Sequence, residues 1–308
     1  MDWKHEKVAI TGATGLIGRA LAARLERDGA SVVRIGRGVS SQVRWDVDRD
    51  ELDPAQLAGV TAVVHLAGAP IAERWTDAQK TAIRESRVRG TALVSRTIAA
   101  MLTPPRVLIS GSAIGIYGSR ADEVLTEDSE LGTDYLANVG KAWERATMGA
   151  EAAGVRVVHL RTGIVLSPAG GALGKLLLPF KLGVGGPVGD GRQWMSWIGL
   201  HDQVEMICWA IANSAVRGPL NAVAPNPVTN AEFASVLGAV LHRPAILPVP
   251  AFALTLAFGE MAEATLLASQ RVRPQRALAA GFPFAEEGLT GALRRELGNQ
   301  GRTGRRNT

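Results

Sequence analysis

The chain has 308 residues, of which 46% are hydrophobic and 20% are charged, and this composition excludes disordered, collagen-like and coiled-coil proteins. The formal charge of +5 arises from 34 basic and 29 acidic side chains, and three of the basic ones, Arg302, Arg305 and Arg306, lie in the last eight residues. No stripe of basic and aromatic residues accompanies this tail, so the charge gives little support for nucleic-acid binding.

The chain also lacks the signals of secretion, membrane insertion and metal binding. A single cysteine, Cys208, can form no internal disulfide, and no cluster of Cys and His has metal-ligand spacing. The first ten residues contain no apolar segment of the kind found in signal peptides. The most apolar later stretch, 245–258, has 14 residues and contains two prolines, too short and too broken for a spanning helix. These features predict a cytoplasmic protein in a reducing compartment.

Residues up to about 166 alternate between short apolar runs and stretches with helical periodicity. The pattern predicts strands at 7–11, 31–36, 62–68, 106–113 and 155–166. It predicts helices from 16 to about 27, over 81–101 and over 135–153. Strands that are apolar throughout and alternate with helices are typical of a parallel sheet covered on both faces. We therefore predict an α/β fold with a doubly wound, Rossmann-like parallel sheet.

The character of the chain changes after Leu166. Residues 167–200 contain so many glycines and prolines that we expect surface loops lining a site and no regular elements. Helices are predicted at 202–213 and 230–241. This pattern suggests a dinucleotide-binding domain over 1–166, with a sheet completed by later strands up to about residue 225. Residues 167–308 then form a substrate-cleft loop and a smaller, mainly helical C-terminal lobe.

A glycine-rich turn follows the first predicted strand and precedes the first predicted helix. It reads Gly12-Ala13-Thr14-Gly15-Leu16-Ile17-Gly18, with glycines at every third position. Glycine allows the backbone to bend sharply and approach a pyrophosphate, and the following helix offers free N–H groups to that anion. In its strand-turn-helix context the motif predicts dinucleotide binding. The expected contacts are Gly12, Thr14, Gly15, Leu16 and Ile17.

The end of the second predicted strand favours NADP over NAD. A site for NAD normally has an acidic residue there for the ribose 2′-hydroxyl. No carboxylate occurs from Ala30 to Trp45, and Arg34, Arg37 and Arg44 stand in that interval. A guanidinium can pair with a 2′-phosphate, and Arg37, immediately after the strand, is the preferred candidate. The alternative is that these arginines are only solvated side chains.

Further cofactor contacts are expected at the ends of the next segments. Asp46 is a candidate for the adenine amino group. Leu66, Ala67 and Gly68 follow a strand and are candidates for contacts with the ribose or the nicotinamide. His65 precedes them and is interpreted as a core histidine.

Several motifs of this chain resemble a known family. TGATGLIG, VVHLAGA, SRVRGT and SGSAIGIYG resemble the extended short-chain dehydrogenase/reductases of the NAD-dependent epimerase/dehydratase branch. LRTGIVLSPAGGALGKLLLPF, GDGRQWMSWIGLHD and NAVAPNPVTNAEF are similar to an atypical subgroup of epimerase family proteins that carry a C-terminal domain of unknown function. The resemblance spans about residues 7–295. It implies a nicotinamide cofactor and epimerase, dehydratase or reductase chemistry.

The chain departs from the family at the usual Tyr-x-x-x-Lys pair, in which the tyrosine exchanges a proton and the lysine lowers its pKa. Tyr135 and Lys141 are six residues apart, which places them about 240° apart around a helix. Aligning on the following Trp-Glu puts Leu136 and Gly140 at the family's tyrosine and lysine positions. We therefore expect the usual pair to be absent.

Two hydroxyl groups remain as catalytic candidates. Ser112 matches the family's serine position, where its hydroxyl would donate to a substrate oxygen as charge develops. Tyr117 lies on the loop that leaves the same strand, toward the edge where such sheets bind ligands. The alternative is a serine satisfied by the backbone and a tyrosine that packs the loop.

The segment 189–197 supplies the expected substrate contacts. The resemblance implies that Arg192, Gln193 and Trp194 contact the nucleotide part of a substrate by charge, hydrogen bonding and stacking. His201 and Asp202 are adjacent, and no G-x-S-x-G motif is present, so a Ser/His/Asp hydrolase is rejected.

These observations together favour an NADP-dependent oxidoreductase or epimerase-like enzyme that acts on a nucleotide-linked or other polar small molecule by hydride transfer. A non-catalytic NADPH-binding sensor or partner-binding protein is the alternative, and a nucleic-acid-associated module is the weakest hypothesis. We expect no nucleic acid, metal or membrane among the partners, and a monomer or homodimer.

Overall fold

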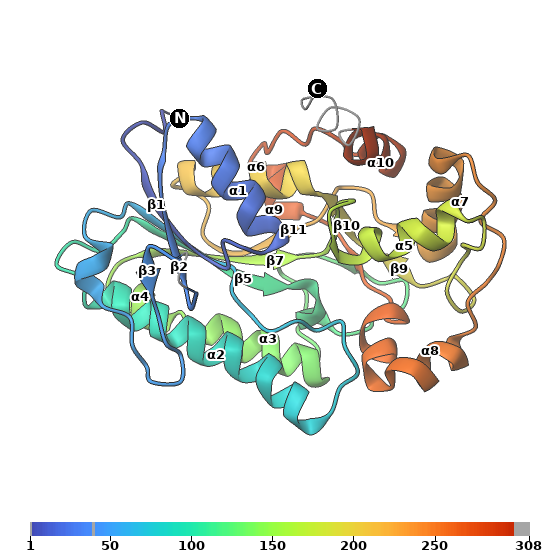
Figure 1. Ribbon diagram of the computed structural model, residues 1–308, viewed down its shortest axis with the longest axis horizontal. Coiled ribbons are helices and arrows are strands. Elements are labelled where there is room, and N and C mark those ends of the chain that lie inside the picture. The colour runs from blue at the N-terminus through green and yellow to red at the C-terminus, as the bar shows by residue number, and fades with distance from the viewer. Residues whose placement is uncertain (1, 39–40, 299–308) are drawn as a thin grey trace.

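A parallel sheet of seven strands forms the centre of the molecule (Figure 1). The computed structural model describes residues 2–38 and 41–298. The strand order is β11-β7-β5-β4-β1-β2-β3, and every neighbouring pair is parallel. The strands are β1 (Lys7–Thr11), β2 (Ser31–Gly36), β3 (Val43–Arg44), β4 (Ala62–His65), β5 (Val107–Ala113), β7 (Arg156–Thr162) and β11 (Gly218–Ala222). The chain runs outward from β1 to β3 and then returns to β4, so a topological switch point lies between β1 and β4.

Helices cover both faces of the sheet, as Figure 1 shows. On one face, α1 (Leu16–Arg27) packs on β1 and α6 (Leu200–Ala212) packs on β5, and the two helices contact each other, with side chains such as Leu21 and Ile207 in one buried cluster. On the other face lie α2 (Asp77–Ala99), α3 (Tyr135–Arg145) and the short α4 (Met148–Ala152). The prediction of a doubly wound Rossmann-like sheet is confirmed. It succeeds because strands buried on both faces must be apolar along their whole length.

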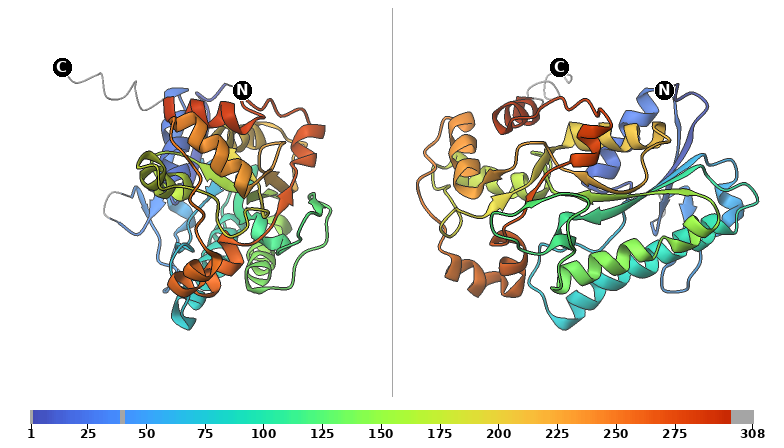
Figure 2. Two further views of the ribbon diagram at one scale, coloured as in Figure 1. Left: turned by 90° about the vertical axis from the view of Figure 1, so that its right-hand side faces the viewer. Right: turned by 180° about the vertical axis from the view of Figure 1, so that it is seen from behind.

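The C-terminal lobe lies beyond the end of the sheet and is mainly helical. Its helices are α5 (Gly171–Lys181), α7 (Asn230–Leu241), α8 (Ala251–Phe258) and α10 (Leu289–Gly298), whereas the short α9 (Gln275–Ala279) packs on β11 at the edge of the sheet. The short helical turns are η1 (Pro54–Leu57), η2 (Ile114–Tyr117) and η3 (Ala262–Leu266). Three two-stranded pairs join the lobe to the loops of the sheet: β8 (Ile164–Leu166) with β10 (Trp197–Gly199), β9 (Trp194–Met195) with β12 (Val228–Thr229), and β6 (Val124–Leu125) with β13 (Arg271–Val272). In Figure 2, right, the same arrangement is seen from behind.

Helix α5 is an element that the sequence prediction missed. The many glycines and prolines led us to expect only loops in 167–200, and this expectation is wrong. Leu173, Leu177 and Phe180 lie at helical spacing on one side of α5 and are buried against α7 and α10. This burial outweighs the weak helix propensity of the glycines.

The described residues contain no helix that has both the length and the apolar character to cross a membrane. In the same part of the chain, no three His, Cys, Asp or Glu side chains are grouped closely enough to hold a metal ion.

Candidate functional site

The glycine-rich turn connects β1 to α1 at the switch point of the sheet. Gly12 has a φ of 68°, and a Cβ atom there would lie 2.9 Å from the backbone nitrogen of Ala67. At Gly18 a Cβ would lie only 2.2 Å from the carbonyl oxygen of Gly12. Glycine is therefore required at both positions, since α1 and the end of β4 pack directly against the turn.

The N-terminus of α1 is open to an anion. Gly15 is its N-cap residue and provides no side-chain hydrogen bond, and no acidic residue lies in the first turn. The side chain of Leu16, the first residue of the helix, lies beside Gly170 and Gly171: its methyl carbons are 3.8 and 3.6 Å from the points that Cβ atoms would occupy there. The free N–H groups and the helix dipole both favour a phosphate group at this position. The turn and the helix thus fit a dinucleotide pyrophosphate.

The end of β4 completes this part of the site. The Thr11 hydroxyl accepts hydrogen bonds from the backbone N–H groups of Leu66 and Ala67, at 3.1 and 3.3 Å, and contacts Nδ1 of His65 at 2.7 Å. His65 is completely buried, and burial lowers the pKa of its imidazole to about 4. A neutral, buried imidazole that helps to hold the backbone of 66–67 acts as a core residue.

The expected 2′-phosphate corner lies at the ends of β2 and β3. Arg37 is exposed directly after β2, and Arg44, exposed on β3, pairs in register with Gly36. Arg34 instead forms an ion pair with Glu26 at 2.6 Å. Asp46 accepts hydrogen bonds from the backbone N–H groups of Asp48 and Arg49, so one of its oxygens stabilises a turn.

A further cation, which the sequence analysis did not single out, lies beside the end of β4. The Cζ atom of Arg87 is 3.3 Å from the position that a Cβ atom would take at Gly68, and the guanidinium stacks on Trp143 with 5.0 Å to the ring centroid. Its Nη1 donates to the carbonyls of Ala69 and Ile83, both at 3.1 Å. Among the described residues, no carboxylate forms a salt bridge with Arg87. Burial lowers the pKa of Arg87 to about 10, which leaves it charged at neutral pH.

Ser112, at the end of β5, is held by a buried ion pair. Its hydroxyl donates to Oε1 of Glu144 at 2.7 Å, and Glu144 binds Arg161 through both carboxylate oxygens at 2.8 and 2.9 Å. Ser112 and Arg161 are each only 4% exposed. Because an ionised carboxylate can only accept, the Ser112 proton points to Glu144 and its lone pairs are left for other donors.

Tyr117, in η2, belongs to the same network. Its hydroxyl donates to Oδ1 of Asn221 at 2.7 Å and accepts from Nη1 of Arg161 at 2.9 Å. The side chain is fully buried, and burial raises the pKa of its phenol. The structure therefore brings Ser112 and Tyr117 together through Glu144 and Arg161, with Tyr117 behind Arg161. Glu144 and Arg161 were not among the predicted site residues.

The side chains of Tyr135 and Lys141 make separate contacts. The Tyr135 hydroxyl donates to the carbonyl of Lys80 at 2.6 Å, whereas Nζ of Lys141 donates to the carbonyl of Gly132 at 3.0 Å. At the family's lysine position, a Cβ on Gly140 would lie 3.0 Å from Cβ of Ile116. The close packing of α3 on η2 leaves little room for a long side chain there.

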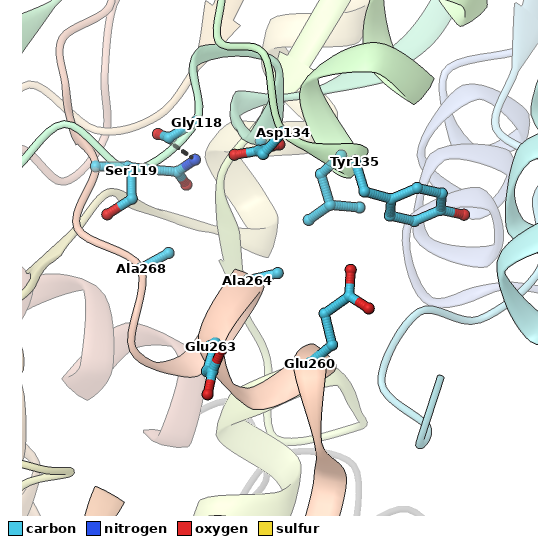
Figure 3. A pocket seen from close by; sticks show the side chains of 11 residues that line it. Gly118, Ser119, Asp134, Tyr135, Glu260, Glu263, Ala264 and Ala268 are labelled. Carbon is cyan, nitrogen blue, oxygen red and sulfur yellow. Dashed lines mark hydrogen bonds between the residues drawn. The ribbon is translucent and has the colours of Figure 1, made fainter. Parts of the chain in front are cut away.

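A cavity of about 230 Å³ opens between the start of α3 and the C-terminal lobe (Figure 3). The lobe contributes Glu260 and Glu263, and α3 contributes Tyr135 and its N-cap residue Asp134. Glu260 forms an ion pair with Lys80 of α2, and Asp134 accepts from the backbone of α3. The other lining residues are Gly115, Gly118, Ser119, Leu136, Ala264, Ala268 and Gln270. The cavity therefore has several carboxylates in its walls.

The predicted substrate contacts at the start of β9 and in the loop before it have different environments. Arg192 is exposed. Gln193 is buried, and its amide donates to the carbonyls of Val188 and Leu266. Trp194 stacks on Arg271 at 4.1 Å and donates its indole N–H to Asp122. Gln193 thus joins the loop to η3, while Arg192 is free to meet a ligand.

The fold and the glycine turn define an α/β protein with a Rossmann-type dinucleotide site. The model of the NAD dependent epimerase/dehydratase family matches residues 8–222, and that of a domain of unknown function matches residues 249–296. The chain belongs to the NAD dependent epimerase/dehydratase family.

Similar proteins are known from bacteria and animals. The chain is 43% identical over 290 residues to Epimerase family protein MT2273 of Mycobacterium tuberculosis, a match that covers 93% of this chain and 96% of the relative. It is 36% identical over 293 residues to Epimerase family protein SDR39U1 of Homo sapiens, with 94% and 98% covered. A crystal structure of human SDR39U1 (isoform 2) with NADPH is similar to this fold with a TM-score of 0.88 and 33% identity, covering 95% of this chain and 99% of that one.

Proposed function

We propose that this protein is an NADP-dependent oxidoreductase or epimerase-like enzyme that transfers hydride to or from a polar small molecule. The observation that carries the proposal is the combination at the switch point: a glycine turn in which Gly12 and Gly18 have no room for a Cβ, and the exposed Arg37 where an acidic residue would select NAD. The human relative crystallised with NADPH supports this choice of cofactor.

The residues around the turn would hold the cofactor in a defined order. The N-terminus of α1 would bind the pyrophosphate, Arg37 the 2′-phosphate, and Leu66 to Gly68 the nicotinamide half. Arg87 lies beside Gly68 with N–H groups to spare and would bind an anionic or hydroxyl oxygen of the cofactor. A bound nicotinamide supplies or accepts a hydride at C4.

Proton handling in this proposal differs from that of the Tyr-Lys pair. Because the Ser112 hydroxyl donates to Glu144, Ser112 would accept a hydrogen bond from a substrate hydroxyl and orient it. As hydride leaves the carbon, the hydroxyl proton would pass to Ser112 and the Ser112 proton to Glu144, and reduction would reverse both transfers. Tyr117 would keep Arg161 and Glu144 in place and would not touch the substrate. Ser112 is thus the proposed catalytic contact, and Tyr117 a positioning residue.

The cavity walls would restrict any substrate group that enters the cavity. Glu260 is compensated by Lys80, but Asp134 and Glu263 would repel a phosphate or carboxylate in the cavity, so the group bound there would be uncharged or cationic. In a nucleotide-linked substrate, the nucleotide would lie toward Arg192, outside the cavity. A substrate without a nucleotide would be subject to the same restriction in the cavity.

Two measurements test the proposal. Calorimetry should give tighter binding of NADPH than of NADH, and a panel of uncharged carbonyl compounds and sugars should yield at least one change in nicotinamide absorbance or one epimerised product. Equal affinity for both cofactors would refute the cofactor assignment.

Because the Tyr-Lys pair is absent, a second candidate function is that of a non-catalytic NADPH-binding sensor. Tight NADPH binding without turnover across the panel would favour it over the enzyme.

A further inference from the structure

A buried histidine lies beside the Glu144–Arg161 pair, and the proposed function does not use it. His159 is on β7, two residues before Arg161, so both side chains point to the face of the sheet that α3 and α4 cover (Figure 1). Its partners in register on the neighbouring strands, Ser110 of β5 and Pro219 of β11, are uncharged. The charges that act on the imidazole therefore come from the helices and from its own strand.

Thr147 determines which nitrogen of this imidazole carries the proton. Its hydroxyl donates to the carbonyl of Glu144 at 2.7 Å, which is much shorter than the alternative contact of 3.5 Å with Glu151. The Thr147 oxygen is also 3.0 Å from Nε2 of His159, and since its only proton is already used, Nε2–H must be the donor there. In the neutral ring Nδ1 is then unprotonated, and it lies 3.8 Å from Oε2 of Glu144. A free base thus faces the carboxylate to which Ser112 donates.

The surroundings of His159 keep the imidazole neutral at pH 7. Burial is the main influence and lowers the pKa of His159 below its ordinary value of 6.5. The carboxylates of Glu144 and Glu151 act in the opposite direction, and the positive charge of Arg161 lowers the pKa further. The ring can therefore accept a proton at neutral pH.

The other side of the ring leads to solvent. Nε2 of His159 is 3.9 Å from Oε1 of Glu151 in α4, and the Glu151 side chain is 47% exposed, whereas that of His159 is 12% exposed. A row of proton-carrying groups thus extends from Ser112 through Glu144 and His159 to the surface. The gaps of 3.8 and 3.9 Å are longer than hydrogen bonds, so a proton crosses each gap only when the carboxyl group turns toward the ring.

We propose that His159 relays the proton of the reaction between Glu144 and solvent, with Glu151 at the exit. This inference rests on the proposed function, because it concerns the proton that accompanies the hydride. It assigns a role to a residue that does not touch the substrate, and it explains how a serine that is only 4% exposed can exchange a proton with water.

The relay balances the protons of an oxidation. The substrate hydroxyl gives its proton to Ser112, and the Ser112 proton passes to Glu144. A protonated Glu144 loses its charge attraction to Arg161, so its carboxyl group can turn and give the proton to Nδ1 of His159. The imidazolium then releases its Nε2 proton to Glu151 or to water beside it. In a reduction, one proton enters from solvent by the reverse steps.

Nitrogen-15 NMR of the full chain tests the state of the ring without a substrate. The chain has five histidines, and the signals of His159 are those that His159→Gln removes. At pH 7 Nε2 should be protonated and Nδ1 unprotonated. The ring should titrate at lower pH in Glu144→Gln and in Glu151→Gln, since each loses a carboxylate that favours the imidazolium. Glu151→Gln alters a half-exposed side chain and serves if Glu144→Gln does not fold. A protonated Nδ1 at pH 7, or a titration that neither variant shifts, would overturn the proposal.

Turnover of a compound from the substrate panel tests the relay itself. His159→Gln should lower kcat about tenfold or more with little change in KM or in NADPH affinity, and added imidazole should restore part of the rate, as it would not for a purely structural defect. His201→Gln is the matched control, because His201 is exposed on α6, on the opposite face of the sheet, and it should keep the wild-type kcat. A wild-type kcat in His159→Gln would refute the relay and leave the proposed function intact. No turnover by the wild type would refute the enzyme, and the relay with it.

Discussion

In the proposed function, the side chain of Arg37 at the end of β2 sets the preference between the two nicotinamide cofactors. Arg37→Ala should weaken NADPH binding by about 1.5–3 kcal/mol, or roughly 10- to 150-fold, and leave NADH binding nearly unchanged, since only NADPH has the 2′-phosphate. Calorimetric titration with each cofactor measures both affinities.

Arg34→Ala is the control for this experiment, because Arg34 lies on β2, three residues before Arg37, but pairs with Glu26. It should leave the ratio of the two affinities unchanged. A similar loss of NADPH and NADH affinity in Arg37→Ala would contradict the assignment of Arg37.

His65 links the stability of the fold to pH. Burial lowers the pKa of its imidazole to about 4 from an ordinary value of 6.5, so the unfolded chain binds more protons than the folded one between these pH values. Folding stability should therefore be complete above about pH 6.5 and decrease as the pH falls toward 4, by roughly 3 kcal/mol from this group.

The contribution of His65 is isolated by comparing the wild type with His65→Asn across this pH range in urea. The difference between the two free energies of unfolding should shrink as the pH falls, since Asn does not titrate. A difference that is constant from pH 7 to pH 4 would show that His65 does not titrate with a lowered pKa.

At the scale of elements, the packing of α1 on the glycine turn depends on Gly18. Gly18→Ala would place a methyl group 2.2 Å from the carbonyl oxygen of Gly12, so helix and turn must separate. We expect a loss of about 1–3 kcal/mol of stability together with a large loss of NADPH affinity. Thermal unfolding and cofactor titration measure the two effects.

Gly174→Ala in α5 provides the comparison, because a Cβ there would lie 3.5 Å from the carbonyl oxygen of Pro168, an ordinary contact. Alanine favours the helix, so this variant should be as stable as the wild type or more stable. If both variants behave alike, the close approach of α1 to the turn is not required.

At the scale of the whole molecule, the Glu144–Arg161 pair connects α3 to β7 and, through Tyr117 and Asn221, reaches the lobe. Asn221 in turn donates to the carbonyl of Arg273 at 3.0 Å. Glu144→Gln removes the negative charge and leaves Arg161 buried without a counter-charge. The expected loss is about 3–5 kcal/mol in the free energy of unfolding by urea.

Asp128→Asn tests whether this loss reflects burial. Asp128 pairs with Arg276 at 2.7 Å, but its side chain is 75% exposed. Water and salt weaken such a pair, so the expected loss is at most about 1 kcal/mol. Equal losses of stability in the two variants would mean that the buried Glu144–Arg161 pair stabilises the fold no more than an exposed ion pair does.

The sequence determined the fold and the glycine turn because both depend on local patterns. A strand covered on both faces needs a continuous apolar run, and a tight turn under a helix N-terminus needs glycine, so the strands β1, β2 and β5 and the turn at Gly12 are readable one segment at a time. The missing acidic residue after β2 is a local signal of the same kind.

Only the tertiary structure decided which distant side chains meet. α2 carries four arginines, and nothing in their spacing distinguishes Arg87, which becomes the one beside Gly68 through the packing of α2 against β4 and α3. In the same way, Glu144 and Arg161 meet Ser112 because α3 crosses the ends of β5 and β7. The helix α5 and the exposure of α8 also depend on which apolar faces find a partner in the folded chain, which is a property of packing and not of local sequence.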